Sequence, residues 1–541
     1  MKRRRILTLL LAGVILASLL AACNTEDAGP GSSPGSTPGA SPSPSASAGG
    51  EQSPAASATA SADPDIELVP YRDHVNLILG QAPDTLDPQM YNNAAAGSVC
   101  AQIFDSLYYF SAMHGEHPRL ALSYDVSGDG LIYTYHLRPG VVFSDGSPFT
   151  ADDVVFTFGR LRPDQNRDAM LKEVVAVDEL TVEFRLNMVN ATFHSGISTI
   201  LIASEAAVAA AGDEVGVKPV GTGPFMLDPD SFLIDQHITV KRNPSHWDHD
   251  AVQIQSATFF VITDALTQYN AFEAGDIDML AVGADQWPGV LDSGKYNTVM
   301  GPIGITTYIV FNTETSPWSD VRVRRAFNYA VDNELVVALA LNGLGTPAVS
   351  AAPPGVIGGA VLPDDPYRYD PQRAKALFAE AGVTDIGKIS TVAGVMQSIL
   401  EIVQQNLQDI GIAMDIDILD SAALTAARNS GNFTAATLGI YLTLEFNQYA
   451  VIYASDGILN LSRLANPKID ELFLTASTTI DTEKRFAIYR QIINLASEDA
   501  RHHYFTHAIF TYAYHPRLAQ TGGEDGAILL RRFAWDLVEV N

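Results

Sequence analysis

Cysteine is scarce in this chain, which has two such residues, Cys23 and Cys100, among its 541. If Cys23 is chemically modified, Cys100 has no partner and an internal disulfide cannot form. Cys100 stands among apolar residues in SVCAQIFDSLY, which is typical of a buried structural thiol rather than a reactive one. We therefore expect a fold without disulfide bonds.

Basic residues are also few, because 33 Lys and Arg face 62 Asp and Glu, for a net charge of −29. The first 22 residues hold four basic side chains and no acidic one, so the rest of the chain is more acidic still. Such a surface repels phosphate backbones, and the sequence has no basic stripe or aromatic RNA-binding motif. This composition excludes nucleic-acid binding as a function and favours solubility.

Recognisable catalytic motifs are lacking. The sequence contains no G-x-S-x-G, P-loop, complete G-x-G-x-x-G or H-E-x-x-H pattern. Three histidines cluster in ARHHYFTHAIF, and a regular strand would place His503 and His507 on one face with His502 on the other. Two ligands about 13 Å apart along a strand cannot chelate one ion. We expect no catalytic residues, no metal site and no cofactor.

The N-terminus carries export and anchoring signals. A basic MKRRR precedes the apolar run ILTLLLAGVILASLLAA, which ends at Cys23. The sequence LAAC at 20–23 resembles the lipobox of bacterial lipoproteins, which implies removal of residues 1–22 and acylation of Cys23. An uncleaved membrane anchor is the alternative, although the apolar run is slightly short for a span. Both interpretations place the globular part outside the cytoplasm, anchored to the cell membrane.

Residues 23–65 form a candidate tether. Beyond Cys23 they are almost wholly Gly, Ser, Pro, Ala and Thr, which cannot build a core, so we expect disorder. A flexible coil of this length has a reach of roughly 35 Å. It would let a folded module move while it stays near the membrane.

The remaining residues are too many for one core, so at least two globular units are expected. Strand and helix patterns alternate throughout, which indicates the α/β class. An Asp129-Gly130 pair predicts a hairpin, and Thr150 with Asp152 and Asp153 predicts a helix start. Strands are predicted at 174–186 (with a turn), 238–242, 257–262, 308–311 and 504–514, and helices at 265–274, 321–337, 371–381, 397–410 and 484–496.

Nine segments in fixed order resemble the large extracytoplasmic solute-binding proteins of the peptide, nickel and opine uptake group, known as family 5. Each segment alone is weak evidence, but their order from Leu77 to Pro516 is specific. They are TLDPQM (85–90), QIFDSLY (102–108), the run from YTYHLRPG to VVFTFGR (133–160), PVGTGPFML (219–227), KRNPSHW (241–247), FEAGDID (272–278), VRVRRAFNYAVD (321–332), YDPQRAKALFAEAGV (369–383) and LQDIGI (407–412).

This resemblance implies a two-lobed periplasmic-binding-protein-like fold of type II, in its large class with an extra subdomain, joined by a hinge. Lobe I would hold residues 66–303, completed by 512–541, and lobe II would hold 304–511. Ligand would bind in the cleft, and the lobes would close over it. We expect a monomer that delivers a small-molecule or peptide ligand to the permease subunits of an ABC importer.

Seven positions follow from the resemblance as candidate ligand contacts. Asn92, Asn93 and Ala94 follow the LDP turn, where peptide-binding relatives contact the ligand backbone, although two asparagines also simply mark a loop. Tyr308 and Asn312 lie on the predicted crossing strand. Tyr308 could stack on a ligand, or it could be a packed strand residue.

The remaining two positions lie where the sequence departs from the family pattern. Peptide binders carry a Trp followed by an Asp that pairs with the ligand's amino group. Here Tyr441 stands near the Trp position, the aligned Asp is absent, and Glu445 is the nearest acid. Glu445 could face a cationic ligand in the cleft or lie on a solvated loop. Peptides, opines, oligosaccharides and metal chelates all remain open as ligands.

Two rival functions are weighed against transport. An extracellular hydrolase would need a catalytic set, which the sequence lacks. A ligand-sensing or chaperone-like receptor without transport has the same sequence features as a transport receptor, and neighbouring permease genes would discriminate between them.

Overall fold

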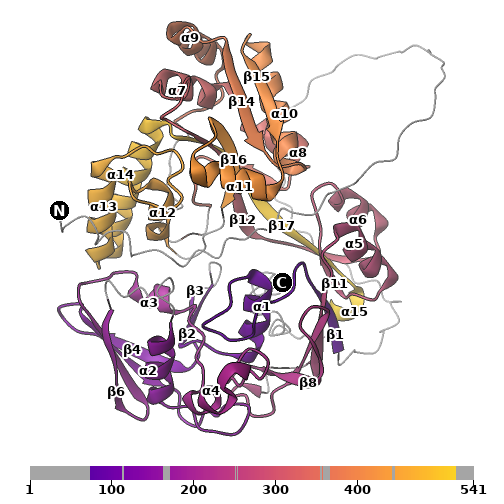
Figure 1. The fold of residues 1–541 in the computed structure, drawn as a ribbon, viewed down its shortest axis with the longest axis vertical. Coiled ribbons are helices and arrows are strands. Elements are labelled where there is room, and N and C mark those ends of the chain that lie inside the picture. Colours follow the sequence, from indigo (N-terminus) through magenta and orange to yellow (C-terminus); the bar gives the residue numbers. More distant parts are fainter. Residues whose placement is uncertain are drawn as a thin grey trace, which may run out of the picture.

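The computed structural model describes residues 74–111, 115–161, 171–249, 252, 254–353, 356, 366–440 and 445–519. The signal segment, Cys23, the tether, Tyr441 and residues 520–541 lie outside this described part. Figure 1 shows two bodies, one above the other. We call the lower body, from β1 to α6, lobe I, and the upper body, from α7 to α14, lobe II.

Lobe I is built first around a four-stranded sheet in the order β1-β10-β9-β8, in which β1 and β10 run parallel and the other pairs antiparallel. Every second residue of β1 is buried, as an amphipathic strand requires. A ten-residue helix, α1, packs on this sheet and buries Cys100 within its core, as predicted. The elements are β1 (His74–Leu79), α1 (Ala94–Ile103), β8 (Phe225–Leu233), β9 (His237–Arg242) and β10 (Ser256–Val261).

A second antiparallel sheet with its own aromatic core, in the order β4-β5-β7-β6, forms a subdomain of lobe I. The predicted hairpin is present, and Gly130 at its turn has a φ of 71°, which favours glycine. Thr150 is the N-cap of α2, as predicted, and the Asp153 carboxylate accepts a hydrogen bond from the Thr150 amide at 2.9 Å. The elements are β4 (Ala121–Val126), β5 (Ile132–Leu137), α2 (Ala151–Arg160), β6 (Leu171–Asp178) and β7 (Thr181–Leu186).

Shorter elements complete lobe I. They are the hairpin β2 (Tyr108–Ser111) and β3 (Gly115–Pro118), the helices α3 (Phe193–Ile197), α4 (Glu205–Ala211), α5 (Ala265–Ala274), α6 (Trp287–Ser293) and α15 (Pro516–Ala519), the 3-10 turn η1 (Gly212–Glu214), and the strand β11 (Met279–Ala281).

Two long strands join the lobes. β12 (Asn297–Phe311) and β17 (His502–Tyr514) are antiparallel neighbours in a seven-stranded sheet, ordered β11-β17-β12-β16-β14-β15 with β13 also on β17. Their lower ends pair with each other beside β11 of lobe I, whereas the upper half of β12 pairs with β16 of lobe II. Both strands therefore run from one lobe into the other (Figure 1). The predicted lobe boundaries at 303/304 and 511/512 fall inside these strands and stay predictions.

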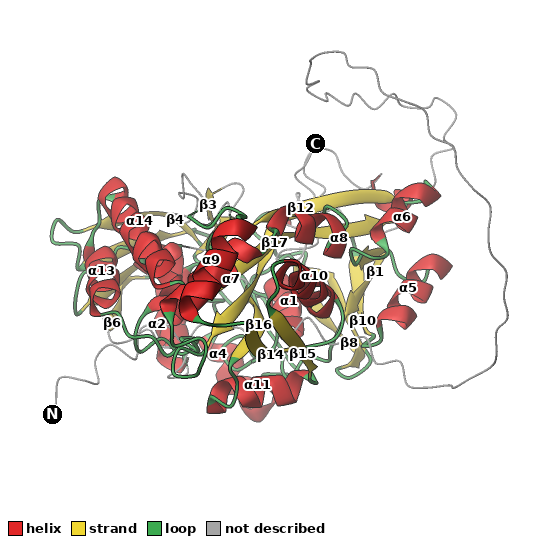
Figure 2. Ribbon diagram, turned by 90° about the horizontal axis from the view of Figure 1, so that it is seen from above, coloured by secondary structure: helices red, strands yellow, loops and turns green. Residues whose placement is uncertain are grey.

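Helices cover both faces of the sheet in lobe II, and two apolar cores result (Figure 2). One face carries α7 (Val321–Ala330), α8 (Asn333–Ala340), α9 (Pro371–Ala381) and α10 (Val395–Asp409). The other carries α11 (Ser421–Ser430), α12 (Ala450–Tyr453), α13 (Pro467–Thr478), α14 (Thr482–Asp499) and the 3-10 turn η3 (Phe446–Tyr449). The strands are β13 (Gly345–Pro347), β14 (Asp385–Thr391), β15 (Ala413–Ile418) and β16 (Ala435–Ile440).

One predicted helix is wrong in extent. The pattern at 321–337 predicts a single helix, but the structure has α7 and α8 with a break at Val331. The Asp332 carboxylate accepts a hydrogen bond from the Leu335 amide and so caps a new helix start. The apolar spacing continues through the break because both helices pack on the same core, so periodicity alone misses it.

Candidate ligand-binding site

The start of α1 carries the three lobe I candidates. Asn93 is the N-cap: its Oδ1 accepts from the Ala96 amide at 2.8 Å, and its Nδ2 donates to the Ala82 carbonyl at 2.9 Å. Asn92 is exposed and Ala94 is half-buried. The Asn93 amide therefore serves the helix and the adjacent loop, and Asn92 offers the accessible polar side chain.

The two candidate ligand contacts at the crossing strand β12 have different surroundings. The Asn312 amide group donates to the Phe433 carbonyl at 2.9 Å, and its oxygen accepts from the Glu314 amide, so this side chain ties β12 to the start of β16. Tyr308 is fully buried beside His502 and Tyr504, and burial raises the pKa of its hydroxyl. Its hydroxyl has no protein partner within the described residues.

Glu445 is buried in an ion pair, with a residue exposure of 4%. Its Oε1 accepts from Arg485 Nε at 2.6 Å and from the Tyr489 hydroxyl at 2.9 Å. The alternative that Glu445 lies on a solvated loop is therefore wrong. Its carboxylate already has a cationic partner, so a ligand ammonium would have to share or displace Arg485.

Arg428 on α11 is a residue that the sequence reasoning missed. Its guanidinium is half-buried and donates to the Thr437 carbonyl at 3.1 Å and to Thr425 Oγ1 at 3.1 Å. No carboxylate of the described residues pairs with it. Burial lowers its pKa, and the nearby Tyr308 hydroxyl acts in the opposite direction. An Arg within RNSGN gives no sequence signal of this position.

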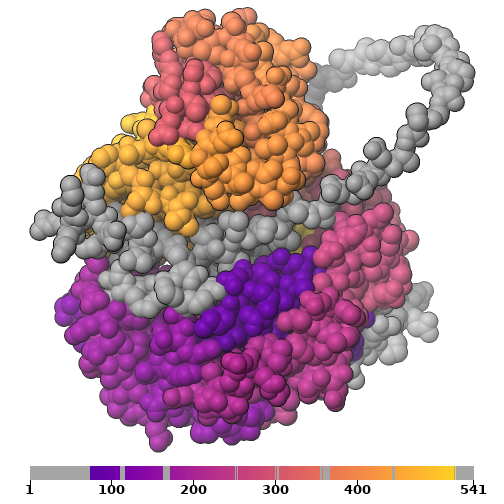
Figure 3. All heavy atoms as spheres, viewed as in Figure 1, coloured from indigo at the N-terminus to yellow at the C-terminus, as the bar shows by residue number. Residues whose placement is uncertain are grey.

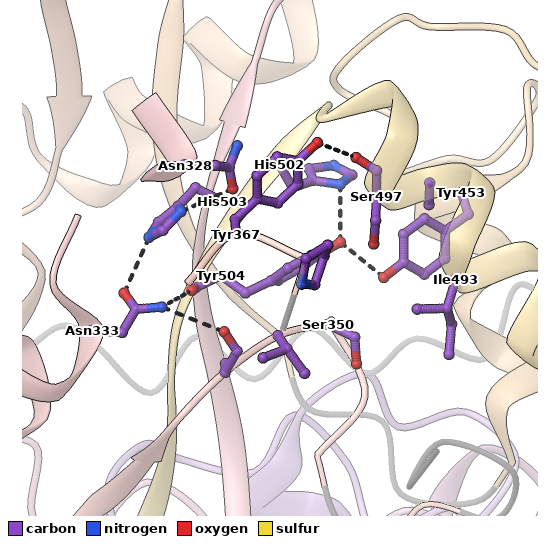
Figure 4. Close-up of a pocket in the computed structure, with 14 residues that line it drawn as sticks. Asn328, Asn333, Ser350, Tyr367, Tyr453, Ile493, Ser497, His502, His503 and Tyr504 are labelled. Atoms are coloured by element: carbon purple, nitrogen blue, oxygen red, sulfur yellow. Dashed lines mark hydrogen bonds between the residues drawn. The ribbon is translucent and has the colours of Figure 1, made fainter. Parts of the chain in front are cut away.

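A polar cavity of about 30 Å³ lies in lobe II between α7, α8, α14 and β17 (Figure 4). Tyr504 links two of its lining side chains, because its hydroxyl lies 2.8 Å from that of Tyr453 and 3.0 Å from His502 Nδ1. His502 Nε2 is buried and has no protein partner among the residues that the structure describes. The space suits about two water molecules, which can donate or accept. A space of this size is much smaller than a typical ligand pocket.

The histidine cluster is arranged differently from the prediction. His502 pairs with Val310 and His507 with Thr306, residues of β12 that share one face, while His503 pairs with Ile309 on the other face. The prediction of a shared face for His503 and His507 is wrong because a bulge near Phe505 shifts the register. Burial lowers the pKa of His503 to about 3 and that of His507 to about 4. Among the described residues, no cluster of three or more His, Cys, Asp or Glu could hold a metal ion.

The lobe I subdomain contributes a Tyr–His–Glu cluster. His194 Nδ1 lies 2.8 Å from the Tyr135 hydroxyl, and its Nε2 lies 3.1 Å from a Glu116 carboxylate oxygen. Tyr124 stacks on the imidazole at 4.1 Å. Burial lowers the pKa of His194 to about 4 and raises that of Glu116. The imidazole is thus neutral at pH 7, and aromatic rings surround it.

A family comparison identifies the chain. The family described as "Bacterial extracellular solute-binding proteins, family 5 Middle" matches residues 116–455. The chain is a family 5 solute-binding protein. The earlier resemblance is therefore confirmed, and members of this family are binding proteins rather than enzymes. The family is extracellular, and the described residues include no helix long and apolar enough to cross a membrane.

Curated relatives of this solute-binding protein bind different solutes. The glutathione-binding protein GsiB of Pectobacterium atrosepticum is 27% identical over 441 residues, 76% of this chain and 84% of the relative. Heme-binding protein A of Haemophilus influenzae is 29% identical over 440 residues, 72% of this chain and 79% of the relative. The relatives support an ABC-transporter substrate-binding protein but divide on ligand.

Solved structures support the predicted type II fold. The ABC transporter substrate-binding protein CtaP of Listeria monocytogenes has a TM-score of 0.78 at 23% identity, covering 86% of this chain and 98% of CtaP. NikA of Brucella suis, solved with Fe(III)-EDTA, has a TM-score of 0.75 at 23% identity, and the match covers 85% of this chain and 99% of NikA. These matches establish the α/β two-lobed architecture.

Proposed function

We propose that this solute-binding protein captures a small peptide-like solute with a free carboxylate between its lobes and delivers it to an ABC import permease. The observation that carries the ligand class is Arg428, a half-buried guanidinium without a carboxylate partner among the described residues. Tyr308, whose buried hydroxyl has no partner in the described part of the chain, lies within its electrostatic reach. Together they offer a donor pair for a ligand carboxylate.

The same geometry argues against a ligand held mainly by its ammonium group. Glu445 is the acid nearest to the expected anchoring position, and Arg485 already neutralises it. Replacing that partner would break a buried ion pair, which typically costs about 3–5 kcal/mol. A carboxylate anchor at Arg428 avoids this cost. Exposed Asn92 at the start of α1 and Tyr441 would complete the contacts as the lobes close.

Ligand-induced thermal stabilisation tests the ligand class. The panel is glutathione, the tetrapeptide Ser-Thr-Ser-Ala, heme and a nickel–histidine complex, each added to the purified full chain. We expect glutathione or the tetrapeptide to raise the melting temperature, by an amount equivalent to about 2.7 kcal/mol at a hundredfold excess over Kd. Stabilisation by heme or nickel–histidine alone would contradict the proposal.

Arg428→Met tests the anchor with the solute that binds in the panel. Losing a charge-assisted pair in a closed site weakens affinity by about 30-fold or more. Arg322→Met is the matched control, because Arg322 is an exposed arginine of the same lobe, paired with Asp320. Equal affinities for the two variants in titration calorimetry would contradict the role of Arg428.

We further propose that residues 1–22 are removed, that Cys23 carries lipid, and that the protein is a monomer without enzymatic activity. One acyl chain binds membranes only marginally, so we expect at least two on the mature residue. Intact-mass spectrometry of the exported protein checks this, with Cys23→Ser as control. If Cys23→Ser still partitions wholly into detergent after processing, the anchor is elsewhere.

A further inference from the structure

Lobe I and lobe II touch at a point remote from their connecting strands. The Ala191 amide, in the loop before α3, donates a hydrogen bond to the Ser477 carbonyl of α13 at 2.8 Å. In Figure 1 the lower ends of α13 and α14 lie above α3, while β12 and β17 join the lobes elsewhere. This contact is therefore positioned to hold the two lobes together on the side away from the hinge.

Apolar packing reinforces this contact. A Cβ atom placed on Gly130, at the tip of the β4–β5 hairpin, would lie 2.9 Å from Ile480 Cδ1 and 3.5 Å from Val189 Cγ1. Ile480 of lobe II thus lies directly over the hairpin of lobe I, yet it remains 56% exposed. A small, partly solvated contact of this kind can open and close, unlike a large apolar interface.

Arg485 fixes the lobe II side of the contact. Its Nη1 donates to the carbonyls of Thr479 at 2.9 Å and Ile480 at 3.0 Å, which form the turn between α13 and α14. Its Nε donates to Glu445, directly after residues 441–444. One buried guanidinium therefore joins the chain that follows β16 to the turn that touches lobe I.

The guanidinium also acts across the lobes. Burial and, to a smaller extent, Tyr124 raise the pKa of the Tyr133 hydroxyl in lobe I, and the positive charge of Arg485 opposes that rise. The Tyr133 hydroxyl donates to the Asn190 carbonyl at 3.1 Å, next to Ala191 in the contact loop. Both sides of the contact are thus supported by a buried polar side chain that holds a backbone carbonyl.

We propose that Arg485 is a positioning residue that couples Glu445 to a latch between the lobes. The latch consists of Gly130, Val189 and Ala191 in lobe I and Ser477 and Ile480 in lobe II. When Glu445 is held by Arg485, the Thr479–Ile480 turn is held in its latching position. Loss of the Glu445–Arg485 pair would loosen the turn. This inference rests on the proposed capture of a solute between closing lobes.

Disulfide trapping in the full chain, purified in detergent without added ligand, tests the latch. The backbone hydrogen bond between Ala191 and Ser477 brings their Cα atoms within disulfide reach, so A191C/S477C should cross-link on mild oxidation. Adding Arg485→Met should lower the yield by about tenfold, the effect of losing about one charge-assisted hydrogen bond. Arg490→Met, five residues along the same helix, is the matched control and should leave the yield unchanged.

A second variant covers the case that Arg485→Met does not fold. Ile480→Asp alters a half-exposed side chain and should lower the yield similarly, whereas Ile458→Asp, at an equally exposed isoleucine of lobe II, should not. Absence of cross-linking in A191C/S477C, or unchanged yields in both Arg485→Met and Ile480→Asp, would overturn the proposal. Since no solute is added, failure of the proposed peptide capture would leave these results unchanged.

Discussion

The two faces of the lobe II sheet bury similar numbers of large side chains but differ in chemistry. On the face covered by α7 and α10, Phe311 stacks on Trp318 at 4.4 Å and Phe327 contacts both rings. On the face covered by α11 to α14, Tyr308, His502 and the Glu445–Arg485 pair are buried beside the apolar core. We refer to these as the apolar face and the polar face.

Buried polar side chains destabilise a core unless their hydrogen bonds are complete. The polar face therefore stabilises lobe II less than an apolar packing of the same volume would. Two of its buried atoms, Tyr308 Oη and His502 Nε2, have no protein partner within the described residues. Among the residues proposed to hold the solute and the latch, Tyr308, Arg428 and Arg485 lie on this face. The apolar face is not free of polar groups, because it also buries Arg324 and His503. The difference nevertheless places the residues that we propose for recognition on one face of the sheet and the large aromatic stack on the other.

The largest expected effect is on the apolar face. Phe327→Ala removes a fully buried ring and should lower the free energy of unfolding by about 4 kcal/mol. Urea denaturation of the full chain measures this loss. Leu339→Ala on α8, where the side chain is 62% exposed, should change it by less than about 0.5 kcal/mol. Similar losses for both variants would contradict the assignment of this core.

On the polar face, Glu445→Gln should lower the free energy of unfolding by about 3 kcal/mol, because it leaves the Arg485 charge buried and unpaired. Glu471→Gln is the control, since Glu471 forms an exposed pair with Lys468 and should lose under about 1 kcal/mol. Should Glu445→Gln weaken only solute binding and leave stability intact, its carboxylate serves the ligand instead.

The pH dependence comes next in size. His503 is neutral when folded, with a pKa of about 3, whereas the unfolded side chain takes up a proton near its ordinary value of 6.5. Stability is therefore complete above about pH 6.5 and falls as the pH drops toward 3, by up to about 1.4 kcal/mol per pH unit for this histidine. In His503→Gln, the free energy of unfolding measured in urea should fall less steeply between pH 7 and 5, by that amount per pH unit. Parallel plots of this free energy against pH for variant and parent would refute the lowered pKa of His503.

The smallest effect is expected from single hydroxyl groups. Tyr308→Phe deletes a buried hydroxyl that no described residue hydrogen-bonds, so stability should stay equal or rise by under about 1 kcal/mol. Tyr453→Phe should instead lose about 1 kcal/mol, because its hydroxyl accepts from the Ala351 amide and bonds Tyr504. Thermal denaturation of the two variants measures this difference, and a loss of stability in both would contradict the prediction.

Much of the fold was predictable because local signals agree with the packing. The helices at 265–274 and 371–381 match α5 and α9, since Gly275 and Gly382 end them in left-handed conformation. The hairpin turn at Gly130 and the cap at Thr150 also match, because turn and cap chemistry depends on neighbouring residues.

The site was harder to predict because it depends on contacts between distant residues. Arg485 meets Glu445 forty residues away, and no local pattern indicates that pairing. The bulge near Phe505 reverses the faces of two histidines, although the strand itself was predicted from 504 to 514. Arg428 was missed for the same reason: its lack of a carboxylate partner is a property of the folded surroundings.

In the space-filling view, the orange and golden residues of lobe II lie above the indigo to magenta residues of lobe I (Figure 3). β17 covers residues 502–514 of 541 and lies between β11 and β12, so a strand made nearly last joins β11 to the rest of the sheet. During synthesis, some five hundred residues emerge before β12 can gain this neighbour. Such non-local pairing forms slowly. The order of translation itself therefore delays completion of this sheet until the last part of the chain has emerged.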